Sequence, residues 1–374
     1  MKSGIKIHDK IPVGILGATG TVGRRLVSLL GSHPWFRVTV LAASSRSAGK
    51  TYAEAVADSW EFGLPIPPSI ARLPLLDASA EQESILRKTR LVFSALKMDK
   101  AAIKTLEEGL AASGQGVVTL NSAHRLTPDI PILLPEVNPQ HTALIDIQRK
   151  NRGWKDGFIA AKPNCSVQSF VPILEALKRF ELEKVMVSTC QAVSGAGRKL
   201  DSWPQMHDNV IPYIDGEEIK TEQEPLKIWG TLGNDGLVPA IKPVISSTCL
   251  RVPVSDGHLA VVHVGFGRKP SQEDLLEAIR NFQDPLRLLD LPSSPKRLLT
   301  YFDEPDRPQT ALDRLLENGM GIAIGRLRED SILDWKFVAL SHNTIRGAAG
   351  GAILMAELLL RLGYVVKKPE GDAS

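Results

Sequence analysis

Hydrophobic and polar positions alternate along the first third of the chain in a way that predicts short buried strands separated by helices. Residues 11–16 form a largely apolar run, which precedes a glycine-rich turn and a helical pattern that ends near Leu30. The same pattern predicts strands at residues 36–43, 91–95 and 117–120, helices at residues 80–89 and up to about residue 112, and a proline-rich connection at residues 60–76. Short apolar strands that alternate with helices indicate a parallel sheet covered on both faces.

The pattern changes near residue 160, where longer strands with polar turns begin. Strands are predicted at residues 185–193, 248–254, 258–264 and 334–340, and a Ser-Asp-Gly turn joins the second of these to the third. Such strands favour a mixed or antiparallel sheet. We therefore predict an α/β protein with a parallel-sheet domain at residues 1–160, completed by a C-terminal helix at residues 345–364, and an α+β domain at residues 161–344.

Composition and charge are those of a soluble globular protein. The chain has 374 residues, 23% of them charged, and a formal net charge of +3 at pH 7 with both signs interspersed, so neither nucleic acid nor a membrane is expected as a partner. The three cysteines show no metal-ligand or disulfide spacing. Residues 1–10 lack an apolar signal core, and we expect a cytoplasmic protein with a charged, frayed tail from Lys367 onward.

The glycine-rich turn lies where a dinucleotide-binding turn is expected. Gly17, Gly20 and Gly23 follow the first strand and open the first helix, with the spacing G-x-x-G-x-x-G. Glycines in this position let the backbone approach a pyrophosphate, which the helix N-terminus then holds. The turn therefore indicates a Rossmann-type domain, although such turns also occur for purely steric reasons.

The end of the second predicted strand indicates which dinucleotide is bound. An acidic residue there would bind a ribose 2′-OH, but this chain has Ser44, Arg46 and Ser47 instead. Hydroxyls and a guanidinium suit a 2′-phosphate, so we predict NADP(H) rather than NAD. The alternative is a solvated serine-rich loop.

Cys165 is the candidate nucleophile. It follows the turn pair Pro163-Asn164 and precedes apolar residues with the spacing of a helix face, so it is predicted to lie near a helix start. Unpaired N–H groups and the helix dipole would favour its thiolate there. The alternative is a buried, inert cysteine, and an interior Pro172 would kink the predicted helix.

Arg125 is a candidate anion-binding residue. It lies just after the strand predicted at residues 117–120, at the edge of the sheet where open α/β sheets bind ligands. A surface arginine is the alternative from position alone.

Several motifs together resemble the aspartate-β-semialdehyde dehydrogenases of the archaeal and fungal branch, and the resemblance runs nearly end to end. Neither the cysteine motif nor the R-V-P-V motif would be specific alone. The motifs are G-A-T-G-T-V-G at residues 17–23, S-R-S-A-G-K at 45–50, P-N-C-S at 163–166, Q-A-V-S-G-A-G at 191–197, R-V-P-V-S-D-G-H at 251–258 and H-N-T-I-R-G-A-A-G-G at 342–351.

The resemblance implies a role for each matching residue. Cys165 would be the nucleophile and His258 the acid/base, while Arg251 would bind the substrate α-carboxylate. Gln191 would position the substrate, Glu217 would meet its amino group, and Lys220 and Arg125 would bind its phosphate. The implied NADP-binding residues are Gly17, Thr19, Gly20, Thr21, Val22, Ser44, Arg46, Ser47, Ser194, Gly195 and Asn343, the last at the nicotinamide carboxamide.

The implied reaction converts an acyl phosphate through a cysteine thioester to an aldehyde, feeds lysine, threonine and methionine biosynthesis, and requires no metal. The family is typically a dimer or a tetramer of dimers. The sequence departs from the usual pattern of the branch in two places. The departure at residues 121–125 affects the assignment of Arg125 as a phosphate ligand, and the one at Val167-Gln168 could change the shape of the pocket floor.

Three alternatives stay open at this point. N-acetylglutamyl-phosphate reductase shares the scaffold, but its usual Gly-Cys-Tyr-Pro motif is absent at residues 164–167. Malonyl-CoA reductase is similar throughout, although its substrate lacks the amino group that Glu217 would bind. A regulatory NADP-binding protein would keep the fold without the chemistry.

Overall fold

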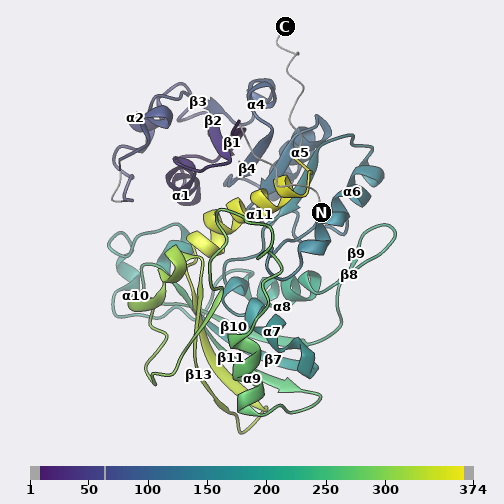
Figure 1. Cartoon of the computed structure of the whole chain (residues 1–374). Coiled ribbons are helices and arrows are strands. Elements are labelled where there is room, and N and C mark those ends of the chain that lie inside the picture. The colour runs from purple at the N-terminus through teal and green to yellow at the C-terminus, as the bar shows by residue number, and fades with distance from the viewer. Residues whose placement is uncertain (1–8, 63–64, 366–374) are drawn as a thin grey trace.

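The computed structural model describes residues 9–62 and 65–365, so the predictions for residues 1–8 and for the tail from Lys367 lie outside the described residues. Two six-stranded sheets dominate the fold, one of them parallel and the other mixed. Figure 1 shows the first sheet in the purple and blue upper part and the second below it, with α11 (Gly350–Arg361) between them in yellow. The predicted α/β fold class is confirmed.

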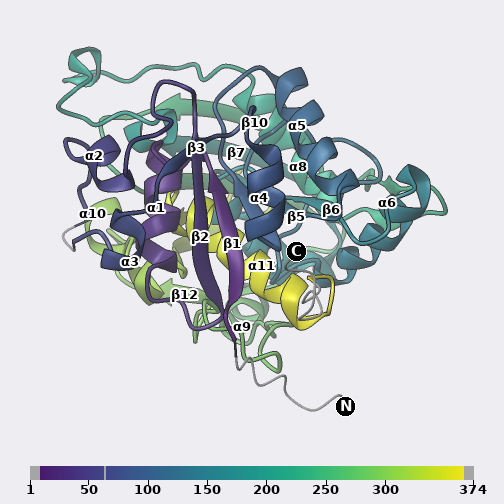
Figure 2. The same ribbon diagram turned by 90° about the horizontal axis from the view of Figure 1, so that it is seen from above.

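The first sheet has the strand order β3-β2-β1-β4-β5-β6, and all its strands are parallel. This is the order of dinucleotide-binding sheets, which bind ligands at the carboxyl ends of their strands. Figure 2 looks down on β1 and β2 of this sheet. The strands are β1 (Ile11–Leu16), β2 (Phe36–Ala43), β3 (Leu75–Asp77), β4 (Leu91–Ser94), β5 (Gly116–Thr119) and β6 (Phe158–Ala161).

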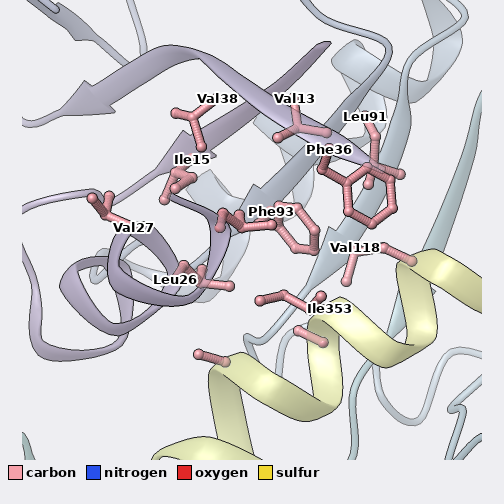
Figure 3. Packing of buried hydrophobic residues seen from close by; sticks show 14 of the residues in the cluster. Val13, Ile15, Leu26, Val27, Phe36, Val38, Leu91, Phe93, Val118 and Ile353 are labelled. Carbon is pink, nitrogen blue, oxygen red and sulfur yellow. The ribbon is translucent and has the colours of Figure 1, made fainter. Parts of the chain in front are cut away.

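Helices cover both faces of this sheet. Leu26 of α1 (Thr21–Leu30) and Ile353 of α11 pack against Val13 and Phe93 on one face (Figure 3). On the other face, α4 (Gln82–Lys88) and α5 (Lys100–Ala112) pack against Val92 and its neighbours. The C-terminal helix therefore belongs to the core of the first sheet. The remaining helices before residue 160 are α2 (Tyr52–Val56), α3 (Pro68–Ala71) and α6 (Leu144–Arg152).

The second sheet has the order β10-β7-β11-β14-β13-β12 and is mixed. Its buried face packs on α7 (Val171–Leu177) and α9 (Gln272–Arg280). Its strands are β7 (Leu182–Gln191), β10 (Val244–Arg251), β11 (His258–Phe266), β12 (Leu299–Phe302), β13 (Ile322–Glu329) and β14 (Trp335–Ser341); outside it lie α8 (Glu217–Ile228), α10 (Thr310–Asp313) and the hairpin of β8 (Thr231–Leu232) and β9 (Leu237–Val238).

The Ser-Asp-Gly turn joins β10 to β11 along the chain as predicted. The two strands are not neighbours in the sheet, however, because β7 lies between them and pairs with both. The chain after β10 crosses the end of β7, where Val193 N donates to Val254 O at 2.9 Å. This crossing brings the ends of β7 and β10 and the start of β11 to one edge, with Gln191 beside Arg251 in the register.

No helix among the described residues is long and apolar enough to span a membrane.

Candidate active site

Cys165 lies in a turn after β6, at the junction of the two sheets. The helix start predicted near Cys165 is that of a short 3-10 helix (Val167–Ser169), and the α-helix α7 begins only at Val171. Pro172 does not kink that helix, because it lies in the first turn, where a missing N–H costs nothing. A helix dipole therefore does not explain how a thiolate would be stabilised here, and the charged neighbours of Cys165 have to do so.

The sulfur of Cys165 contacts His258 and Asn164. Its Sγ lies 3.3 Å from His258 Nε2 and 3.3 Å from Asn164 Oδ1. The Ala192 N–H donates to His258 Nδ1 at 3.1 Å, which assigns the proton of the neutral ring to Nε2. His258 can therefore donate to the sulfur, or to an oxygen bound next to it.

Burial acts on both members of this pair. Burial, followed by the repulsion of Arg251, lowers the pKa of His258 to about 3, so the ring is neutral at physiological pH. Burial and the nearby Glu217 raise the pKa of Cys165 to about 11, against the opposing effect of Lys162, Arg125 and Arg251. Burial therefore has the largest effect on the pKa of this thiol, one carboxylate adds to it, and three cations oppose it.

Glu217 lies at the start of α8 and is the hub of a buried hydrogen-bond network. Its carboxylate accepts hydrogen bonds from Asn164 Nδ2 at 2.8 Å and Gln191 Nε2 at 3.1 Å, and Lys220 Nζ lies 3.2 Å away. Burial would raise the pKa of Glu217, but Lys220 and these hydrogen bonds hold it below its usual value. Glu217 and Lys220 therefore form more than a solvated pair on a helix surface.

Arg251 ends β10 and points toward the same region. Its Nη1 donates to Ala192 O at 2.7 Å, and the side chain is buried. A Cβ added to Gly195 would lie 2.8 Å from that Nη1 and 3.1 Å from His258 Nε2. Residue 195 therefore has to be a glycine for these two side chains to keep their places.

Arg125 is buried rather than a surface residue. Its Nη1 donates to Glu224 Oε1 at 2.8 Å, and the other oxygen of Glu224 accepts from the backbone N–H of Asn164 at 2.5 Å. Lys227 Nζ donates a hydrogen bond to the Arg125 carbonyl at 2.7 Å. Glu224 thus ties Arg125 to the cysteine loop, a link that no spacing in the sequence indicated.

A cavity of about 190 Å³ connects the cysteine to predicted cofactor residues. Cys165 and Arg125 line it together with Val22, Ser194 and Asn343. Asn343 Nδ2 donates to Ser194 Oγ, and Asn343 Oδ1 accepts from Gly257 N, both at 2.8 Å. A larger cavity of about 560 Å³, beside α9, holds none of the predicted site residues.

The glycine turn between β1 and α1 fits a dinucleotide. Gly17 has φ +83°, and a Cβ on it would lie 2.4 Å from Ala95 O; a Cβ on Gly23 would lie 2.2 Å from Gly17 O. Gly20 caps α1 with no side-chain hydrogen bond, and no acidic residue occupies the first turn. The N-terminus of α1, with Thr21 and Val22, is therefore open to an anion.

The remaining predicted cofactor residues lie at the ends of the first two strands. Thr19 belongs to the turn after β1, whereas Ser44, Arg46 and Ser47 follow β2. Ser44 and Arg46 are exposed, so their polar groups are accessible to a ligand along this edge.

Two residues close to the sulfur had no predicted role. Asn164 belongs to the P-N-C-S motif and Lys162 directly precedes it, so their adjacency to Cys165 was the available signal. Among residues 9–62 and 65–365, no group of three or more His, Cys, Asp or Glu side chains is arranged to hold a metal ion.

This combination of a dinucleotide-binding sheet and a cysteine pocket in a mixed-sheet domain is that of the semialdehyde dehydrogenases. Family models described as "Semialdehyde dehydrogenase, NAD binding domain" and "Semialdehyde dehydrogenase, dimerisation domain" match residues 12–145 and 171–346.

Comparison with individual proteins shows which family of semialdehyde dehydrogenases the chain belongs to. The chain is 42% identical to aspartate-semialdehyde dehydrogenase of Archaeoglobus fulgidus, over 93% of this chain and 98% of that protein. It is 41% identical to the Aspergillus fumigatus enzyme, over 96% and 99%. The crystal structure of the Candida albicans enzyme with NADP superposes with a TM-score of 0.84 at 36% identity, covering 96% of this chain and all of that one. The chain therefore belongs to the aspartate-semialdehyde dehydrogenase family, in its archaeal and fungal branch.

Proposed function

We propose that this enzyme reduces L-aspartyl-4-phosphate to L-aspartate-4-semialdehyde with NADPH and releases phosphate, with Cys165 as nucleophile. The observation that carries the proposal is the Cys165–His258 contact at 3.3 Å, together with the cavity that Cys165 lines with predicted cofactor residues. The names of the archaeal and fungal relatives support the substrate. The product would enter lysine, threonine and methionine biosynthesis in the cytoplasm.

The charged residues near Cys165 match the groups of this substrate. Arg251 would bind the α-carboxylate through its fork, and Glu217 would accept hydrogen bonds from the α-ammonium. Arg125 and Lys220 would bind the phosphate and stabilise it as it leaves. Gln191, fixed to Glu217 at 3.1 Å, would orient the substrate.

Cys165 and His258 would carry the covalent steps. The thiolate attacks the acyl carbon, the bond to the phosphate oxygen breaks, and a thioester forms on Cys165. After reduction of the thioester to a thiohemiacetal oxyanion, His258 Nε2–H is placed to donate a hydrogen bond to that oxygen and stabilise its charge. When the oxyanion collapses to the aldehyde, the C–S bond breaks and the thiolate leaves.

NADPH would supply the hydride when bound. Its pyrophosphate would lie against Gly17, Gly20 and the N-terminus of α1 with Thr19, Thr21 and Val22, and Ser44, Arg46 and Ser47 would meet a 2′-phosphate. Ser194, Gly195 and Asn343 would position the nicotinamide end beside Cys165. The NADP of the Candida albicans structure supports this choice over NAD.

The second sheet has an uncovered face that suits a second copy of the chain. Met186 of β7 is 47% exposed and alternates with buried residues, and Val244 of the edge strand β10 is 66% exposed and alternates with half-buried residues. We propose a homodimer through this face, with a tetramer as the larger assembly; the matched dimerisation-domain model supports it.

The test is phosphate-dependent reduction of NADP by aspartate semialdehyde, with NAD in parallel and Cys165→Ser as control. Rapid turnover with NADP that the serine variant loses would support the proposal. A well-folded enzyme that is inactive here but reduces malonyl-CoA would overturn it, and Glu217→Gln would then keep its activity because that substrate has no amino group.

A further inference from the structure

Lys162 is a buried cation beside the nucleophile. It is the first residue after β6, and its side chain is 2% exposed. Its Nζ donates to Gly347 O at 2.5 Å and to Pro163 O at 3.3 Å. In the described part of the chain, no carboxylate lies within ion-pair distance of this ammonium. A buried ammonium without a carboxylate is unfavourable, which calls for a reason to retain it.

A second buried lysine shows what a purely structural role looks like. Lys227 Nζ donates to three carbonyls, those of Arg125, Thr127 and Ile130, at 2.6 to 2.8 Å. These use all three N–H groups of that ammonium. Lys162 has two carbonyl partners, and it lines the cavity that holds Cys165, so one N–H remains for a group in that cavity.

Two glycines make room for Lys162 next to the sulfur. A Cβ on Gly351 would lie 2.9 Å from Lys162 Cε, and a Cβ on Gly347 would lie 2.9 Å from Cys165 Cβ. The carbonyl of the same Gly347 accepts the Lys162 hydrogen bond. Lys162, Gly347 and Cys165 therefore pack as one unit.

The other cations near the sulfur have partners of their own. Arg125 is paired with Glu224, and Arg251 binds the Ala192 carbonyl. In the proposed reaction both would also meet anionic groups of the substrate. Glu217 opposes a negative sulfur, and His258 is neutral. Lys162 is the cation left to the sulfur itself.

Resting on the proposed function of Cys165, we propose that Lys162 is a positioning residue whose ammonium, held in place by the Gly347 carbonyl, stabilises the Cys165 thiolate. The lysine acts through the cysteine and need not touch the substrate. The stabilisation is electrostatic, so a neutral side chain of the same shape should lose it.

The charges around Lys162 are consistent with this coupling. The pKa of Lys162 is lowered to about 7, mainly by burial; Cys165 and Glu224 oppose this lowering, and Arg125 and Arg346 add to it. By reciprocity, a protonated Lys162 lowers the pKa of Cys165.

The experiment measures the rate of Cys165 alkylation by iodoacetamide as a function of pH in the full-length enzyme, with peptide mass spectrometry to identify the modified cysteine. Lys162→Met removes the charge and the hydrogen bonds, whereas Lys162→Gln removes the charge but retains N–H donors. Lys227→Met is the matched control for loss of a buried lysine.

Both Lys162 variants should raise the apparent pKa of Cys165 alkylation by about one unit or more, which is about a tenfold slower reaction near neutral pH. Lys227→Met should leave that pKa unchanged. An unchanged pKa in both Lys162 variants, or a shift in Lys162→Met alone, would overturn the proposal. If the wild type still turns over aspartate semialdehyde, only the role of Lys162 fails; if it does not, the proposed function fails as well.

Discussion

The Nε2 atom of His258 lies 3.3 Å from the Sγ atom of Cys165, although 93 residues separate the two in the chain. The cysteine comes from the loop after β6 in the first sheet, and the histidine opens β11 in the second. The Ala192 N–H fixes the histidine tautomer so that the proton faces the sulfur. The contact therefore brings together one residue from each of the two sheet domains, and these two residues carry the proposed covalent chemistry.

His258→Gln should lower kcat by about 10²- to 10³-fold with little change in the KM for aspartate semialdehyde, because the imidazole Nε2–H that donates to the oxyanion is lost while the groups that bind the substrate stay. Steady-state kinetics measure this. The control is His263→Gln on the same strand, because His263 pairs with Asp330 away from the cavity. Equal losses in both variants would contradict the role of His258.

Variants of Arg125 and Arg251 should each weaken the binding of a different substrate of the oxidative reaction. Arg125→Gln should raise the KM for phosphate, and Arg251→Lys the KM for aspartate semialdehyde, each by about tenfold or more, because each loses charge-assisted hydrogen bonds to one anion. Initial rates measured while one substrate at a time is varied will show the split. If both variants affect the same substrate, the assignment is wrong.

Arg46→Ala should weaken NADP far more than NAD. The guanidinium is exposed at the end of β2, where it would meet only the 2′-phosphate, so about a tenfold rise in the KM for NADP is expected. Fluorescence titration with NADPH and NADH gives the affinities directly. An equal loss for both cofactors would place the 2′-phosphate elsewhere.

The free energy of unfolding should decrease as the pH falls, because His258 is buried in its neutral form. Burial lowers its pKa to about 3, against about 6.5 in an unfolded chain. The unfolded state therefore binds a proton that the folded state does not between these values, and stability falls as the pH falls through this window. The free energy of unfolding of the wild type, relative to His258→Gln, should drop by about 1.2 kcal/mol from pH 6 to pH 5. Urea unfolding at one protein concentration measures this, and a constant difference would show that His258 takes up its proton in the folded state.

Much of the first sheet could be predicted because its strands are short, apolar and local to their helices. The strand predicted at residues 36–43 has the observed bounds of β2. The turn after β1 could be predicted because its backbone conformation and close packing require a glycine at residue 17, and the sequence has one there. The helix α3 and the start of β3 were not predicted, because they are short and lie in the proline-rich segment at residues 60–76, which was interpreted as a connection.

Long-range pairing could not be predicted in the same way. The hydrophobic pattern of β10 and β11 gives two strands but not the insertion of β7 between them, which depends on parallel pairing with a strand some 60 residues away. For the same reason Glu224 was only one of several nearby acids in the sequence. Its link to Arg125 and Asn164 arises from how α8 docks, and no local spacing encodes that docking.

The central claim is that Cys165 forms the acyl intermediate, and the most direct test is a single-turnover experiment without phosphate. The enzyme is mixed with aspartate semialdehyde and NADP, and NADPH absorbance and the intact protein mass are followed. The account predicts a burst of about one NADPH per subunit, with an acyl adduct on Cys165 that added phosphate releases. A burst in Cys165→Ser, or steady turnover of the wild type with no adduct on Cys165, would contradict it.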